Sequence, residues 1–112
     1  MTKEARARDI SVNRRAFHDY AIGERYEAGL VLTGSEVKSL RAGRANLKDS
    51  YARFFGEDLF LVGAHISPYA PASQFGHDPE RSRKLLLHRR ELDRLHTRIQ
   101  EQGLTLIPLR LY

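Results

Sequence analysis

Short runs in which apolar residues occupy every second position constrain the fold of this chain more than any other feature of its sequence. The run from His18 to Leu32 is interrupted by Gly23, which predicts a strand, a bend and a second strand. Two further runs, residues 51–55 and 59–66, flank Gly56-Glu57-Asp58, a connection typical of an antiparallel hairpin. The chain is therefore predicted to be mainly β.

Two segments have the pattern of helices. Ser35 is suited to cap a short helix over residues 36–42, which Gly43 would end in the left-handed conformation. The longest helix is predicted over residues 88–102, where charged residues surround an apolar stripe formed by Leu92, Leu95 and Ile99. This stripe should pack against the sheet.

Strands with short connections and two helices favour a small antiparallel β-barrel or strongly curved sheet, the class that includes the oligonucleotide-binding barrels. Residues 1–12 are polar and aperiodic, so we expect a flexible basic N-terminal arm followed by a single domain over residues 13–112. Residues 67–83, with three prolines, are predicted to be a loop, and residues 104–112 a last strand in which Pro108 favours an edge position.

The amino-acid composition limits the classes of partner, chemistry and location that are compatible with this chain. Lys and Arg number 19 against 14 Asp and Glu, a net charge of +5, which makes polyanions the leading partner class, with a basic surface that serves only solubility as the alternative. The absence of Cys excludes disulfides, thiolate metal sites and cysteine nucleophiles, and it suits a reducing cytoplasm. The N-terminus has no apolar stretch of the signal-peptide kind, and no run approaches the roughly 18 apolar residues of a membrane span, so we expect a cytoplasmic protein.

Two groups of cations are candidates for contacts with phosphate. The first spans the end of the short helix and the turn after it, and consists of Lys38, Arg41, Arg44 and Lys48. Asn46 and Ser50 can add hydrogen bonds there. The alternative interpretation of this group is a solvated helix face with Glu36 as the local counter-charge. The second flanks Leu85-Leu86-Leu87 and consists of Arg81, Arg83, Lys84, Arg89 and Arg90.

Arginines also repeat along the long helix, at Arg90, Arg94 and Arg98, with Glu91 and Glu101 as partial compensation. This stripe favours a solvated face over an RNA groove. The aromatic residues interleaved with cations are interpreted mostly as core because of their period-two spacing: Tyr20, Tyr26, Tyr51, Phe54 and Phe55. Tyr69 and Phe75, in the predicted loop, are freer to stack on bases.

No strong catalytic or metal-binding motif is present. The pairs His18-Asp19 and His77-Asp78 are nonspecific, and the potential ligands His65, His77, Asp78 and His88 lack the spacing of a known metal site. Phosphate-binding glycine loops are absent as well. A nucleic-acid hydrolase acting through His18 or His77 remains one alternative, and a structural ribonucleoprotein component remains another.

Three segments carry a more specific signal. They are Asn13-Arg14-Arg15-Ala16-Phe17-His18-Asp19-Tyr20; Tyr26-Glu27-Ala28-Gly29 followed by residues 34–43; and Asp78-Pro79 followed by Arg83-Lys84-Leu85-Leu86-Leu87. In this order and spacing the chain resembles the SsrA-binding protein (small protein B) family almost continuously from residue 13 to residue 112. Residues 45–51 and 65–69 also fit this resemblance.

The resemblance implies a non-catalytic, monomeric protein with no cofactor, built on a barrel related to the oligonucleotide-binding fold. It would bind the tRNA-like domain of transfer-messenger RNA and deliver this RNA to stalled ribosomes, meeting alanyl-tRNA synthetase and elongation factor Tu only indirectly, through the RNA. The implied RNA-binding residues are Asn13, Arg14, Glu27, Lys38, Arg41, Arg44, Asn46, Lys84 and Leu86. His18 would face the decoding centre of the small ribosomal subunit, where an imidazole can stack or hydrogen-bond.

Two departures from the family pattern bear on these expectations. Phe17 stands where the family usually has Arg, which removes one cation, and the family continues past Tyr112 with closing strands and a long basic tail. Glu27 also needs a physical role because a carboxylate repels phosphate. We expect it to accept hydrogen bonds from base donors or to fix a neighbouring Arg.

Overall fold

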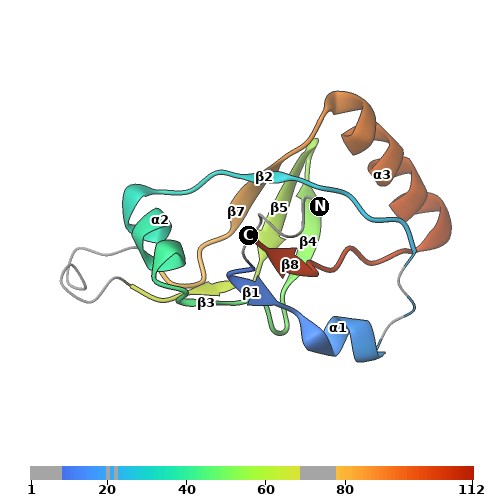
Figure 1. Cartoon of the computed structure of the whole chain (residues 1–112). Helices are drawn as coiled ribbons and strands as arrows, with labels where there is room; N and C mark the ends of the chain where they lie inside the picture. Colours follow the sequence, from blue (N-terminus) through green and yellow to red (C-terminus); the bar gives the residue numbers. More distant parts are fainter. Residues whose placement is uncertain (1–8, 20, 22, 69–77) are drawn as a thin grey trace, which may run out of the picture.

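The computed structural model describes residues 9–19, 21, 23–68 and 78–112, and it shows a sheet-dominated fold with helices at its periphery (Figure 1). The described strands form three antiparallel sheets, with the orders β2-β7-β5-β4, β1-β8 and β3-β6. The strands are β1 (Ser11–Val12), β2 (Gly29–Leu30), β3 (Ala45–Asn46), β4 (Tyr51–Phe55), β5 (Asp58–Val62), β6 (His65–Ile66), β7 (Arg83–Leu86) and β8 (Arg110–Leu111).

The N-terminal third differs from the sequence-based expectation. Residues 14–19 form the helix α1 (Arg14–Asp19), whose last two residues overlap the run expected to begin as a strand at His18. Among the described residues of that run, only β2 is a strand. The alternating apolar residues from His18 to Leu32 therefore cover two different structures. The first is the end of α1, and the second is an extended segment that pairs with β7 only near its C-terminal end. Tyr20 lies outside the described residues.

The first described strand lies before residue 13, where the domain was expected to begin. Ser11 pairs with Leu111 and Val12 with Arg110, so the predicted arm over residues 1–12 was too long at its C-terminal end. A two-residue strand has no period to detect, and its partner lies at the other end of the chain. Residues 1–8 are outside the described part, so a flexible arm there stays a prediction.

The short helix is confirmed as α2 (Gly34–Arg41), but its cap is Thr33 and not Ser35. The Thr33 hydroxyl accepts from the Glu36 N–H, and the Glu36 carboxylate accepts from the Thr33 N–H at 2.8 Å, which is a capping box. Gly43 follows with φ +73°, the left-handed conformation predicted for the end of this helix.

The hairpin is confirmed. β4 and β5 are antiparallel, with Phe55 opposite Asp58, so the connection is two residues long rather than three. The apolar run that follows is divided at Gly63, which has φ +83°. The chain there leaves the large sheet, and β6 pairs with β3.

The long helix is confirmed as α3 (Arg89–Gln102), and it ends at Gly103 in the left-handed conformation. Leu92 and Leu95 pack against Leu59 of β5, as the apolar stripe predicted. None of the described helices has the length and apolar character that crossing a bilayer requires. The last segment is a strand only at β8, although Leu106 also forms an isolated bridge to Ala52.

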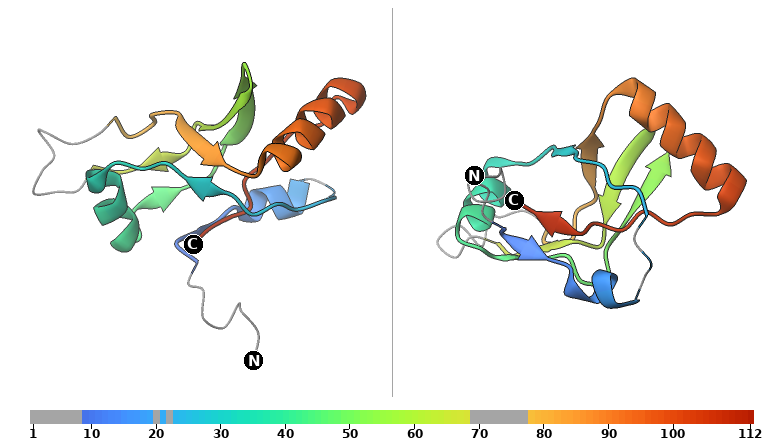
Figure 2. Two further views of the ribbon diagram at one scale, coloured as in Figure 1. Left: turned by 90° about the horizontal axis from the view of Figure 1, so that it is seen from above. Right: turned by 45° about the vertical axis from the view of Figure 1, so that its right-hand side comes forward.

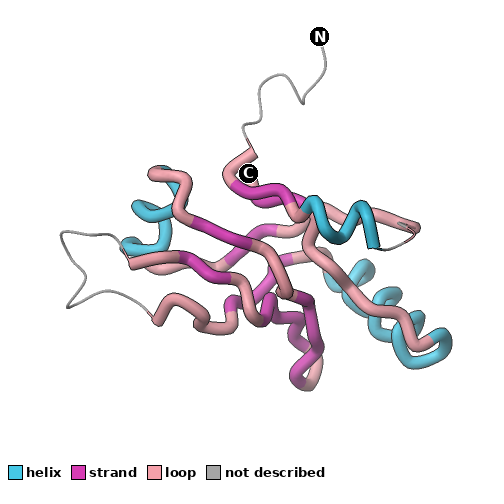
Figure 3. Tube along the Cα trace, turned by 90° about the horizontal axis from the view of Figure 1, so that it is seen from below, coloured by secondary structure: helices cyan, strands magenta, loops and turns pink. Residues whose placement is uncertain are grey.

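The core occupies the inner face of the four-stranded sheet. One cluster centres on Leu47, Leu61 and Ala64, and a second joins Leu59 to α3. Figures 2 and 3 show the strands between α2 and α3, with β1 and β8 crossing beside them. The expected closed barrel is not formed by the described strands, because β2 and β4 remain the two edges of the large sheet. The antiparallel, sheet-dominated class with flanking helices is confirmed.

Candidate nucleic-acid interface

The first predicted cation group, which we call the α2 cluster, consists of Lys38, Arg41, Arg44 and Lys48. Two members lie on α2, and the others lie on either side of β3. All four side chains are exposed. None makes an ion pair with a carboxylate among the residues that the structure describes. The cluster therefore presents uncompensated positive charge to solvent.

The acid expected to compensate this cluster faces the interior instead. Glu36 is 0% exposed, and Arg83, also 0% exposed, donates from Nε to its Oε2 at 2.7 Å. Arg81 donates from Nη2 to Oε1 at 2.6 Å and from Nε to Oε2 at 3.2 Å. Glu36 is thus the counter-charge of two arginines more than forty residues away. It does not neutralise the α2 cluster, as the interpretation of that cluster as a solvated helix face required.

The environment of Glu36 also fixes its ionisation. Burial alone would raise the pKa of this carboxyl, but hydrogen bonds from Arg81, from the Thr33 N–H and from Arg83 outweigh it and lower the pKa to about 2. The same pairing raises the pKa of Arg81 above its ordinary value. A carboxylate that accepts this many donors stays ionised at neutral pH.

The second predicted cation group is only partly a surface: Lys84, Arg89 and Arg90 are exposed, whereas Arg81 and Arg83 bind Glu36. Arg83 is buried and uses its remaining donors on the Ala64 carbonyl at 2.9 Å and the Pro79 carbonyl at 3.0 Å. Arg89 pairs with Asp93 at 2.9 Å, and Lys84 lies 3.6 Å from Asp58. The grouping by sequence was therefore wrong for Arg81 and Arg83, because a charge run does not reveal which members face a distant buried acid.

The arginine stripe of α3 is also compensated, as expected for a solvated face, but by a different acid. Glu24 pairs with Arg94 at 2.9 Å and with Arg98. Glu91, one of the two expected partners, instead accepts from the His88 N–H at the start of the helix. An RNA groove along this stripe gains no support from these contacts.

The structure brings Glu27, Lys84 and Leu86 to one region. Gly29 pairs with Leu86, so Glu27, two residues before Gly29, lies near the end of β7. All three side chains are exposed, and Leu86 is 50% exposed. Leu86 is therefore not a core residue of the described fold.

Asn13 differs from the other predicted RNA-binding residues because it is 6% exposed. Its Nδ2 donates to the Pro108 carbonyl at 3.0 Å, and its Oδ1 accepts from the Ala16 N–H at 3.2 Å. The side chain therefore caps α1 and ties it to the C-terminal segment.

On α1 itself, Arg14 and His18 are exposed. Asn46, also exposed, accepts from the Lys48 N–H at 2.8 Å, which leaves its amide donors outward.

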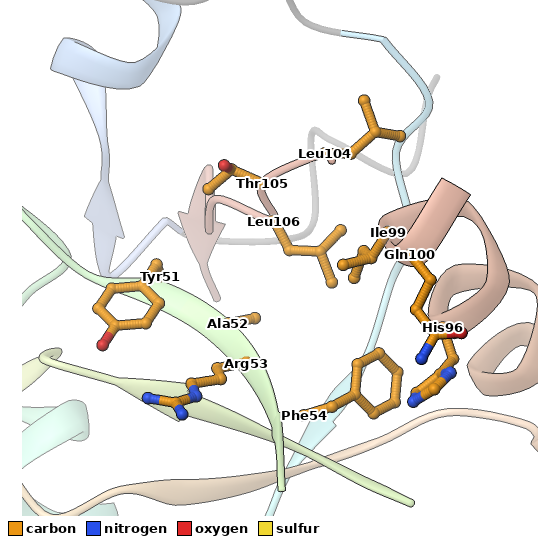
Figure 4. A pocket seen from close by; sticks show the side chains of 10 residues that line it. All are labelled: Tyr51, Ala52, Arg53, Phe54, His96, Ile99, Gln100, Leu104, Thr105 and Leu106. Atoms are coloured by element: carbon orange, nitrogen blue, oxygen red, sulfur yellow. The ribbon is translucent and has the colours of Figure 1, made fainter. Parts of the chain in front are cut away.

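A hollow of about 310 Å³ lies between β4 and the end of α3 (Figure 4). Phe54 and His96 meet edge to face in its wall, 4.9 Å between ring centroids. The lining contains no carboxylate, so no acid is present there to orient the imidazole as a general base. The described residues also contain no group of three potential metal ligands. His77, Tyr69 and Phe75 lie outside the described residues.

The aromatic prediction was correct for only part of the set. Tyr26 and Phe54 pack against the cluster around Leu59. Tyr51 and Phe55 are exposed, at 38% and 48%, so these two members of the set do not belong to the core. Side chains along β4 alternate between the two faces of the strand, so the sequence alone does not show which face is buried. The position of α3 decides which face of β4 is covered.

Together, these features define a class: a small, basic, antiparallel-sheet protein whose exposed cations and apolar side chains suit contact with a polyanion. The chain belongs to the SmpB protein family, whose model matches residues 10–112.

Individual relatives agree with this assignment. The chain is 61% identical to the SsrA-binding protein of Syntrophobacter fumaroxidans, over 96% of this chain and 66% of that protein. It is 56% identical to the SsrA-binding protein of a Sulfurihydrogenibium species, over 92% of this chain and 68% of the relative. A solved structure described as "tmRNA-SmpB: a journey to the center of the bacterial ribosome" matches with a TM-score of 0.73 at 52% identity, over 90% of this chain and 71% of the other. The chain spans about two thirds of the length of these curated relatives.

Proposed function

We propose that this chain is a non-catalytic RNA-binding protein that binds the tRNA-like domain of transfer-messenger RNA and delivers this RNA to stalled ribosomes in trans-translation. The observation that carries the proposal is the α2 cluster, whose expected counter-charge, Glu36, is buried against Arg81 and Arg83. Membership of the SmpB family and the names of its relatives supply the identity of the RNA.

The α2 cluster serves affinity in this proposal. Cations that lack an acidic partner release counterions when they neutralise phosphates, and this release is the main sequence-independent contribution to binding. Lys38 and Arg41 come from one helix, and Arg44 follows at its end, so a short backbone segment of RNA can meet them in succession. Asn46 adds amide donors for a phosphate or sugar oxygen.

The Glu27 and Leu86 region serves specificity. Glu27 accepts hydrogen bonds from base donors in an RNA loop, and Leu86 supplies apolar contact. Both side chains are exposed, so their replacement leaves the core intact. We expect Glu27→Gln and Leu86→Asp each to weaken RNA binding while the unfolding midpoint stays near that of the parent chain. Unchanged RNA affinity in Glu27→Gln would exclude the proposed role of the carboxylate.

The helix α1 faces the ribosome in this proposal. His18 contacts the decoding centre of the small subunit, and Arg14 adds a cation on the same helix. Asn13 contributes by holding α1 in place, since its amide is occupied by protein carbonyls. The open antiparallel sheets are related to the oligonucleotide-binding fold, and the protein acts as a monomer in the cytoplasm. Alanyl-tRNA synthetase and elongation factor Tu are met through the RNA.

The test is a binding titration of the 112-residue chain with a transcript of the tRNA-like domain, in the presence of an equal-length unrelated tRNA. We expect binding that resists this competitor and weakens with salt. The matched control is a variant with the α2 cluster neutralised, Lys38→Ala with Arg41→Ala. Equal affinity for both RNAs would contradict specific recognition by these residues.

A further inference from the structure

The face of the four-stranded sheet that points away from the core carries an exposed apolar patch. The side chains of Leu59, Leu61 and Leu85 are on the core side, so their neighbours along each strand face outward. The outward set, which we call the outer sheet face, consists of Val31, Tyr51, Arg53, Phe55, Asp58, Phe60, Val62, Lys84 and Leu86. It includes four of the seven large apolar side chains that are exposed among the described residues.

The register of the strands makes this set contiguous. Arg53 is opposite Phe60, and Phe60 is opposite Lys84, so one row crosses three strands. The Val31 N–H donates to the Lys84 carbonyl at 3.0 Å, which extends the row to the segment after β2. Figure 4 shows Tyr51 and Arg53 pointing away from α3, on the opposite side of β4 from Phe54.

Two rings and one guanidinium form the centre of the outer sheet face. The rings of Phe55 and Phe60 meet edge to face with centroids 5.5 Å apart. The Arg53 guanidinium lies 4.9 Å from the Phe55 ring centroid. Arg53 makes no ion pair with any acid in the described part of the chain. The centre thus combines two rings with one unpaired guanidinium, while Asp58, opposite Phe55, is compensated by Lys84 at 3.6 Å.

This combination suits unpaired nucleotides better than a protein partner. Exposed rings and guanidinium planes stack on bases, and an uncompensated cation attracts the adjacent phosphate. The outer sheet face is also continuous with Lys84 and Leu86, which the proposed function already assigns to RNA. An apolar partner protein would gain nothing from Arg53 at the centre, because burying an unpaired charge is costly.

We propose that the outer sheet face is a base-stacking platform, in which Phe55, Arg53 and Tyr51 hold unpaired nucleotides of the bound RNA. The proposal rests on the proposed function and extends it from β7 to the edge strand β4. Phe55 and Tyr51 supply the stacking surfaces, and Arg53 supplies the cation between them. These residues were not among those predicted from the sequence to bind RNA.

The first test uses tryptophan fluorescence, since the chain has no Trp. In Phe55→Trp, we expect titration with the tRNA-like domain transcript to quench the new fluorescence with the same midpoint as a gel-shift titration. A gel shift without quenching would overturn the platform and leave the proposed function intact. No gel shift for the parent chain would refute the proposed function itself, so the two failures are distinguishable.

The second test is alanine substitution. Phe55→Ala should lower the affinity for the transcript by about 5- to 100-fold, the range for losing one stacked base. Tyr112→Ala is the matched control, because Tyr112 is equally exposed but lies outside the outer sheet face. Phe55 is exposed, so thermal unfolding should show both variants folded. Parent-like RNA affinity in Phe55→Ala would overturn the proposal and leave the face open to a protein partner.

Discussion

Glu36 and Arg83 form an ion pair that is wholly excluded from solvent, with 2.7 Å between Oε2 and Nε. The pair joins the first turn of α2 to the first residue of β7. The Arg83 guanidinium also donates to the carbonyls of Ala64 and Pro79. It therefore connects β7 with α2 and with the segments that contain these two carbonyls. The pair therefore positions α2, and with it the α2 cluster, relative to the sheet.

Removing the acid should destabilise the fold strongly. Glu36→Gln leaves Arg83 buried without a counter-charge, which typically costs about 3–5 kcal/mol. Urea unfolding followed by circular dichroism measures this. Glu80→Gln, at an exposed acid, is the matched control and should change the free energy of unfolding by less than about 0.5 kcal/mol. A small effect of Glu36→Gln would mean that the arginines find other partners.

Stability should fall in acid because of the same carboxyl. The pKa of Glu36 is about 2 in the folded chain and 4.5 in the unfolded chain, so the unfolded state binds more protons between these values. Stability is then fully present above pH 4.5 and is lost as the pH falls toward 2, by about 3 kcal/mol from this group. Urea unfolding from pH 6 to pH 2 tests this. In Glu36→Gln the acid loss should shrink by that amount, and a parallel curve would contradict the assignment.

The α2 cluster should determine part of the salt dependence of RNA binding. Each phosphate neutralised contributes about 0.7–0.9 to the slope of log affinity against log salt. The double variant Lys38→Ala with Arg41→Ala should therefore reduce the slope by about 1.5. Arg94→Ala with Arg98→Ala removes two cations that already pair with Glu24, so it should leave the slope nearly unchanged. If the two double variants showed the same slope of log affinity against log salt, the bound phosphates would not lie at the α2 cluster.

Asn13 should act through stability. Asn13→Ala removes a buried amide that donates to Pro108 and caps α1, and the expected loss is about 1–3 kcal/mol. Asn46→Ala, at an exposed asparagine, is the control and should have a small effect on stability. Thermal unfolding compares the two. A stable Asn13→Ala variant that has lost RNA affinity would instead support direct contact between Asn13 and RNA.

Some of this protein follows from local sequence. The helix α3 and the β4-β5 hairpin were predicted correctly because an apolar stripe, a terminal glycine and a short turn act within a few residues. The helix α2 was also predicted, although Thr33 rather than Ser35 caps it. The family resemblance rested on strings of residues in order, which need no tertiary information, and the family model confirms it.

Other features depended on contacts between distant parts of the chain. The sequence placed Arg81 and Arg83 with other cations, whereas in the fold both pair with the buried Glu36, and Arg83 is itself buried. Alternation along β4 could not say which face α3 covers, so it did not show that Tyr51 and Phe55 are exposed. The sequence by itself determined the local elements and the family, because periodicity, caps and motifs are local. Only the tertiary structure decided which charges are neutralised and which rings are free, because burial depends on residues that meet across the fold.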